Sequence, residues 1–103
     1  MKHIDPRTFV ASQAWGALDI ANLNGTTVRL HWTDQPYQWH VNDGAEVFVV
    51  LDGTVNMHHK TSGVEQVTKL KPGDIFYAGA GDEHFAEPIG VARILVIEKE
   101  GSI

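Results

Sequence analysis

Turn-forming residues divide this sequence at short and regular intervals, and this spacing constrains the fold more than any other feature. The turn clusters lie at residues 24–25, 34–36, 42–44, 52–53, 62–63, 72–73, 79–81 and 88–90. Glycine and asparagine tolerate positive φ and proline presets a bend, so each cluster favours a turn. Turns separated by roughly 8–12 residues are typical of an all-β sandwich or barrel.

Between the turns the sequence predicts about nine short strands. They span residues 17–23, 26–32, 37–41, 45–51, 54–59, 64–70, 74–78, 84–87 and 91–98. A short helix is expected to begin at Asp5, because Pro6 favours the first helical position. We therefore expect one domain over residues 1–103, with an amino-terminal arm over 1–15 and a barrel over 16–99.

Two of the predicted strands, at residues 47–51 and 94–97, are apolar at every position. Such strands are usually covered by protein on both faces. The covering layer is either the second sheet of a sandwich or a partner subunit, and we expect a homodimer. The alternative is a monomer whose outer face is covered by the amino-terminal segment.

Composition argues against several classes of partner. The formal net charge is −5 and there is no basic run, so nucleic-acid binding is not expected. The apolar stretches are too short to span a bilayer and the amino terminus lacks a signal-peptide apolar region, so we expect a cytoplasmic protein without a membrane partner. The absence of cysteine removes disulfides, thiolate ligands and a cysteine nucleophile.

The first group of chemically active side chains lies in residues 39–46. The Asn42-Asp43-Gly44 sequence suits a three-residue hairpin loop, which would place His40 opposite Glu46. Opposite residues on antiparallel strands have Cβ atoms about 4.5–5.5 Å apart on one face. From this hairpin alone, a functional pair and a hydrogen-bonded surface pair are equally compatible with the sequence.

A second segment, residues 71–85, contains a Pro-Gly-Asp turn, a short apolar strand, a glycine-rich bend and a histidine. With this segment the sequence resembles the cupin superfamily, whose motifs read G-(x)5-H-x-H-(x)3,4-E-(x)6-G and G-(x)5-P-x-G-(x)2-H-(x)3-N. The matching residues are His40, Glu46 and Gly53 in the first motif and Gly73, Gly81 and His84 in the second. The resemblance covers residues 23–98 and implies a cupin jelly-roll β-barrel, a double-stranded β-helix.

The sequence departs from these motifs at four positions, occupied by Asp34, Asn42, Gly79 and Pro88. Asn42 is the departure that bears on chemistry, because it replaces the second histidine of the first motif. In the family, the motif histidines and glutamate hold a divalent metal such as iron, manganese, nickel or zinc.

The resemblance implies that His40, Glu46 and His84 are metal ligands, with Asn42 as a weak amide ligand or a hydrogen-bond partner of a ligand. Two imidazoles and one carboxylate suit non-haem iron and leave coordination positions open for substrate, water or O₂. Strand alternation puts Phe48 and Val50 on the same face as Glu46, and so in the wall of the pocket.

Arg29 and His31 share one face of the strand 26–32. They would bind anions if that face lined the barrel, but a solvated or interface stripe is expected. His58 and His59 are adjacent on a strand and point to opposite faces, so they cannot share one metal.

Two functions remain open. The first is a metal-dependent enzyme acting on a small polar molecule such as a sugar or organic acid, with Glu46 or a bound water moving a proton. The second is a non-catalytic cupin that binds or senses a small ligand through a degenerate metal site. The loss of one motif histidine favours the second function, and the retention of the other ligands favours the first.

Overall fold

The computed structural model describes residues 1–102, most of which lie in β-strands. The strands are β1 (Gly16–Leu23), β2 (Thr26–Thr33), β3 (His40–Val41), β4 (Glu46–Thr61), β5 (Val64–Leu70), β6 (Ile75–Ala78) and β7 (Glu83–Lys99). A single turn of 3₁₀ helix, η1 (Pro6–Thr8), precedes them. Within this part of the chain, no helix has the length and apolar character needed to cross a membrane.

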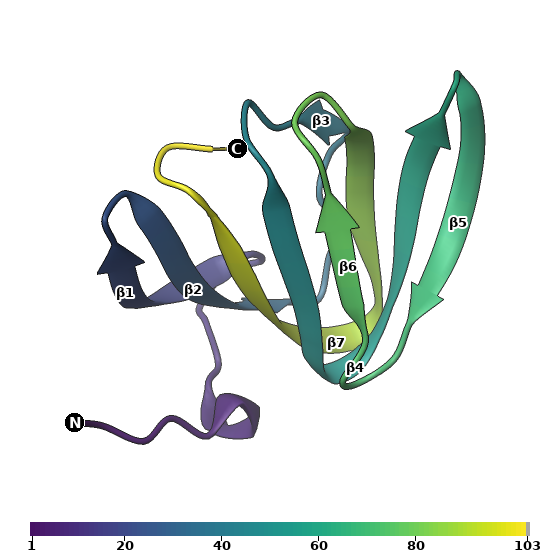
Figure 1. The fold of residues 1–103 in the computed structure, drawn as a ribbon. Helices are drawn as coiled ribbons and strands as arrows, with labels where there is room; N and C mark the ends of the chain where they lie inside the picture. Colours follow the sequence, from purple (N-terminus) through teal and green to yellow (C-terminus); the bar gives the residue numbers. More distant parts are fainter. Residues whose placement is uncertain (103) are drawn as a thin grey trace.

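The two long strands β4 and β7 organise the sheet. They pair antiparallel over nearly their whole length, from Glu46 opposite Glu98 to His59 opposite His84. Strands β2 and β3 pair with β7, strands β5 and β6 pair with β4, and β1 extends the sheet beyond β2. Figure 1 shows that both long strands bend midway, so that the sheet wraps into two facing layers. This is the all-β jelly-roll architecture expected from the sequence.

The sheet has 7 strands rather than the predicted nine, because two turn clusters bend a strand without ending it. The predicted strands 45–51 and 54–59 merge into β4, which begins at Glu46, and the predicted strands 84–87 and 91–98 merge into β7. At the bend of β4, Gly53 has a φ of +81°, and a Cβ there would collide with the carbonyl oxygen of Val91. Glycine is therefore required where the two long strands pass each other.

The core lies between the layers and consists of alternate residues of the long strands. Its buried members include Phe48, Val50, Met57, Ile94 and Val96. The opposite face is less well covered: Val47 and Val49 are half-buried, while their β6 partners Tyr77 and Ile75 are 65% and 68% exposed. The apolar outer face is thus only partly covered by this chain.

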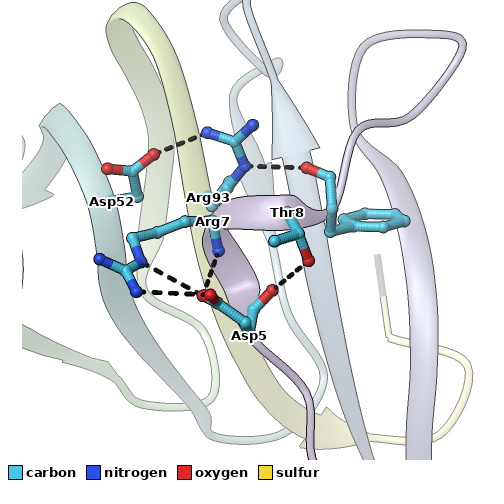
Figure 2. Close-up of polar contacts among 6 residues, drawn as sticks. Asp5, Arg7, Thr8, Asp52 and Arg93 are labelled. Atoms are coloured by element: carbon cyan, nitrogen blue, oxygen red, sulfur yellow. Dashed lines mark hydrogen bonds and ion pairs between the residues drawn. The ribbon is translucent and has the colours of Figure 1, made fainter.

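The amino-terminal arm is fastened to the long strands by Arg93 (Figure 2). Its Nε donates to the carbonyl oxygen of Phe9 at 2.8 Å, and its Nη1 donates to Oδ2 of Asp52 at 2.6 Å. The Asp5 side chain caps η1 by accepting from the backbone N–H of Arg7, so the short helix begins as predicted. The arm then leads to Trp15, immediately before β1.

Candidate metal centre and adjoining cavity

Three side chains from different strands converge at one end of the barrel. His40 lies on β3, Glu46 is the first residue of β4, and His84 lies near the start of β7. One ligand atom from each lies within 4.8 Å of the others. Glu46 and His84 are 6% and 1% exposed, and His40 is half-buried. Two imidazoles and a carboxylate at this separation can hold a divalent metal ion.

The strand pairing behind this convergence differs from the predicted hairpin. β3 pairs with β7, with His40 opposite His84, and it does not pair with β4. The loop over residues 42–44 is instead tied to the glycine-rich bend, where the N–H of Gly81 donates to the carbonyl oxygen of Asn42. The hairpin prediction was wrong because a turn sequence indicates a change of direction and does not identify the pairing partner.

Backbone carbonyl groups orient both histidines. Nδ1 of His40 lies 2.9 Å from the carbonyl oxygen of Gln38, and Nδ1 of His84 lies 3.0 Å from that of Asp82. A carbonyl oxygen only accepts, so Nδ1 carries a proton in each ring and Nε2 is the ring's other donor or acceptor. Burial lowers the pKa of His40, which keeps its Nε2 available as a ligand.

Glu46 and His84 form a buried pair, with Nε2 of His84 3.0 Å from Oε1 of Glu46. Burial disfavours the charged imidazole, but the hydrogen bonds to Glu46 and to the carbonyl of Asp82 raise the pKa of His84. Burial likewise opposes ionisation of Glu46, but hydrogen bonds with His84 and Glu98 lower its pKa below the ordinary value. A metal ligated by Nε2 of His84 would therefore displace a proton from this pair.

Asn42 is 1% exposed and contacts the carboxyl groups beside the cluster. Its Nδ2 donates to Oε2 of Glu98 at 3.0 Å and to Oε2 of Glu46 at a longer 3.5 Å. Its Oδ1 is buried without a hydrogen-bond partner among residues 1–102. Asn42 thus lies against a candidate ligand and offers one unpartnered acceptor.

Glu98 is a polar residue of this site that the sequence analysis missed. It lies directly opposite Glu46 in the β4–β7 ladder, so both carboxyl groups occupy the same face. Burial, followed by the hydrogen bond and the charge of Glu46, raises the pKa of Glu98 to about 8. Glu98 therefore keeps a proton at neutral pH. Strand alternation carried a signal, because Glu98 continues the buried row of Ile94 and Val96.

The cluster borders a cavity of about 220 Å³, whose wall also contains Trp15, Arg29, His31, Tyr37 and Phe48. A cavity of this volume admits a small molecule. The lining includes Phe48, as the alternation predicts. Val50 lies on the same face, but it is packed in the core with 0% exposure and does not line the cavity.

Arg29 and His31 face this cavity, which contradicts the expected solvated or interface stripe. They lie opposite Val96 and Ile94 of β7, both of which are buried. The sequence divided the residues of β2 between two faces but did not show which face is the interior. The face opposite Arg29 and His31 is also apolar, and its Leu30 is 1% exposed. Burial lowers the pKa of His31, whose Nδ1 lies 3.0 Å from the carbonyl oxygen of Trp15.

Comparison with known proteins gave structural matches alone, since no protein-family model and no curated protein matches the chain. A cupin-2 domain containing protein from Shewanella frigidimarina is 26% identical, with a TM-score of 0.77 over 87% of this chain and 85% of that one. A cupin superfamily protein from Desulfitobacterium hafniense is 15% identical, with a TM-score of 0.75 over 96% and 92% of the two chains. Hydroquinone 1,2-dioxygenase in complex with Cd²⁺ and 4-hydroxybenzonitrile is 17% identical, with a TM-score of 0.74 over 87% and 67%.

These matches extend over most of the chain. The glycine bend at Gly53 and the converging His40, Glu46 and His84 are the residues through which the sequence resembles the cupin motifs. This chain is a small cupin-fold protein.

Proposed function

We propose that this protein is a metal-dependent cupin that binds a divalent ion at His40, Glu46 and His84 and acts on a small polar molecule in the barrel cavity. The observation that carries the proposal is the convergence of three ligand atoms within 4.8 Å at the edge of a 220 Å³ cavity. The structural likeness to a dioxygenase that holds Cd²⁺ supports it. Iron, manganese, nickel and zinc all accept this donor set.

In this proposal, His40 and His84 contribute Nε2 and Glu46 contributes a carboxylate oxygen. The bound metal would polarise a substrate oxygen or lower the pKa of a bound water. The carbonyl groups of Gln38 and Asp82 hold the two rings in orientation through Nδ1. Such carbonyl partners fix the ring tautomer and increase the basicity of the ligating nitrogen. The buried amide of Asn42 holds Glu98 beside Glu46, and its unpartnered Oδ1 would be a weak additional metal ligand.

Glu98 is the group best suited to hold and release a proton in this site. In the site without a metal ion, its pKa of about 8 keeps the carboxyl group protonated at neutral pH, within hydrogen-bonding reach of Asn42. A general acid works best when its pKa lies near the working pH. We assign proton donation to Glu98, and metal ligation to Glu46, which the sequence suggested as the catalytic group.

The test is metal content and affinity in His84→Ala and in a matched control, His3→Ala. His3 is exposed in the amino-terminal arm and lies outside the cluster, so its variant controls for the loss of one histidine. We expect wild type and His3→Ala to bind about one divalent ion per chain and His84→Ala to retain almost none. Unchanged metal occupancy in folded His84→Ala would refute the assignment.

A non-catalytic ligand-binding cupin is the second candidate, and the observation that favours it is Asn42. An amide oxygen binds late first-row metals more weakly than an imidazole, so this site lacks one strong ligand of the family motif. The two functions differ in their response to a chelator. Ligand binding that is unchanged after metal removal, without turnover of any tested acid or sugar, would favour the binding function.

A further inference from the structure

One buried hydrogen-bond donor of a residue that lines the cavity has no acceptor. Nε1 of Trp15 is buried and makes no hydrogen bond with the residues that the structure describes. The indole ring packs edge-on against Tyr37 and His31, with ring centroids 5.3 and 5.9 Å away. All three residues line the cavity. Buried N–H groups in folded proteins almost always have partners, so a donor at this position indicates a ligand atom or a water.

The backbone holds Trp15 in an unfavourable conformation. Its φ is +61°, in the left-handed region that bulky residues avoid. The turn is closed by a hydrogen bond from the N–H of Gly16 to the carbonyl oxygen of Gln13, and His31 contacts the carbonyl of Trp15. Upstream, the contact of Arg93 with Phe9 fastens the arm (Figure 2). Strained residues that the surrounding structure maintains are concentrated at ligand sites.

Arg29 provides a second donor in the same cavity wall. Its Nε donates to Oδ1 of Asp19 at 2.7 Å, in an ion pair whose two side chains are 42% and 82% exposed. Its two Nη atoms make no hydrogen bond or ion pair within residues 1–102. A guanidinium group anchored in this way retains further N–H groups that match the two oxygens of a carboxylate.

We propose that Trp15 and Arg29 form a carboxylate-binding subsite, and that the molecule that enters this cavity is a small organic acid and not a sugar. The guanidinium group supplies charge and N–H donors in a plane, and the indole supplies one more N–H to the same anion. Tyr37 and Phe48 offer aromatic surface to the body of an acid, whereas Glu46 and Glu98 lie in the same wall on the side of the metal cluster. The role of the organic acid as a substrate rests on the proposed metal-dependent function, whereas the binding of the acid to this subsite does not.

Benzoate is the probe, because it joins one carboxylate to a flat apolar body, and benzamide is its uncharged counterpart of similar shape. Calorimetry would measure both affinities for wild type, Arg29→Gln and Trp15→Phe, each metal-free and loaded with Zn²⁺. Trp15→Phe removes the N–H and keeps an aromatic ring. Trp39→Phe is the matched control, because Trp39 contacts Phe85 and Lys60 and does not line the cavity.

We expect wild type to bind benzoate at least tenfold more tightly than benzamide in both metal states. Arg29→Gln should lose at least tenfold in benzoate affinity and Trp15→Phe about fivefold, with Trp39→Phe unchanged. Each variant should retain the wild-type melting temperature within about 3 °C, and Arg29→Lys keeps the test valid if Arg29→Gln does not fold.

Equal affinity for benzoate and benzamide in wild type, or wild-type benzoate affinity in Arg29→Gln, would overturn the proposal. Benzoate binding that requires Zn²⁺ and is unaffected by Arg29→Gln would also overturn it, since the metal would then hold the carboxylate. Titration of each protein with Zn²⁺ alone separates the two proposals. Failure of wild type to bind Zn²⁺ refutes the metal site, while benzoate binding to metal-free protein still tests the subsite.

Discussion

Replacing Glu98 by glutamine should make the metal-free protein more stable at alkaline pH. An unperturbed glutamate ionises near pH 4.5, whereas Glu98 in the folded protein ionises at about pH 8. Between these values the folded state binds more protons than the unfolded state, so stability falls as pH rises. The contribution of Glu98 is fully present below about pH 4.5 and is lost once pH exceeds about 8. Glutamine keeps the neutral form at every pH, with an oxygen that accepts from Asn42 and an amide that donates to Glu46.

The magnitude follows from the pKa difference and from the exposure of the side chain. Each pKa unit corresponds to about 1.4 kcal/mol, so full burial would give an upper limit of roughly 5 kcal/mol. Glu98 is only half-buried, and solvent screening reduces this value. We therefore expect Glu98→Gln to exceed wild type by about 1–2 kcal/mol at pH 9 and to match it within about 0.5 kcal/mol at pH 5.

The assay is urea unfolding at several pH values between 5 and 9, in the presence of a chelator, with equal m-values as the condition for comparing free energies. Glu65→Gln is the matched control, since Glu65 is exposed on β5 and makes no contact with the cluster. Its difference from wild type should not depend on pH. A free-energy difference for Glu98→Gln that is constant from pH 5 to pH 9 would refute the protonated carboxyl group inferred for Glu98.

Three further predictions concern the metal and the outer face. Zn²⁺ affinity should rise about tenfold per pH unit until His84 loses its proton, because hydrogen bonds raise the pKa of His84. Titration between pH 6 and 9 against a chromophoric chelator tests this, and an affinity that does not change with pH would contradict it. Asn42→His should bind Zn²⁺ or Ni²⁺ at least about tenfold more tightly in the same competition assay, because an imidazole replaces an amide oxygen. Weaker binding by a folded variant would show that the side chain at position 42 does not reach the ion. Sedimentation at micromolar concentration should show a dimer, because Val47, Val49, Ile75 and Tyr77 leave an apolar surface on the outer face; a clean monomer would contradict this.

Short-range spacing was sufficient to predict an all-β fold, whereas the cupin barrel and the grouping of His40, Glu46 and His84 were implied by the resemblance to the cupin motifs. The intervals between His40, Glu46 and Gly53 and the second segment ending at His84 carry that resemblance. Strand alternation then placed Phe48 inward with Glu46. The turn spacing and the strand alternation are local properties of the chain, and for that reason the sequence alone predicts them.

The parts that the sequence did not predict depend on long-range pairing. The partner of β3 is β7, more than forty positions away in the chain, and the intervening turn contains no information about it. The inward position of Arg29 and the contact of Glu98 with Glu46 likewise depend on which strands are neighbours in the sheet. Alternation assigns residues to two faces, whereas the packing of the whole sheet determines which face becomes the interior.

The position of β7 in the sheet affects how the protein can be synthesised and folded. In the strand order β1-β2-β7-β4-β5, the last strand within residues 1–102 lies between β2 and β4. Synthesis therefore produces β2 and β4 before their common neighbour, and the edges of β2 and β4 that face β7 stay unpaired until β7 is added. Open edges of this kind invite pairing with other chains. Together with the long sequence separations that β7 must bridge, this order favours slow folding after synthesis and makes the nascent chain prone to aggregation.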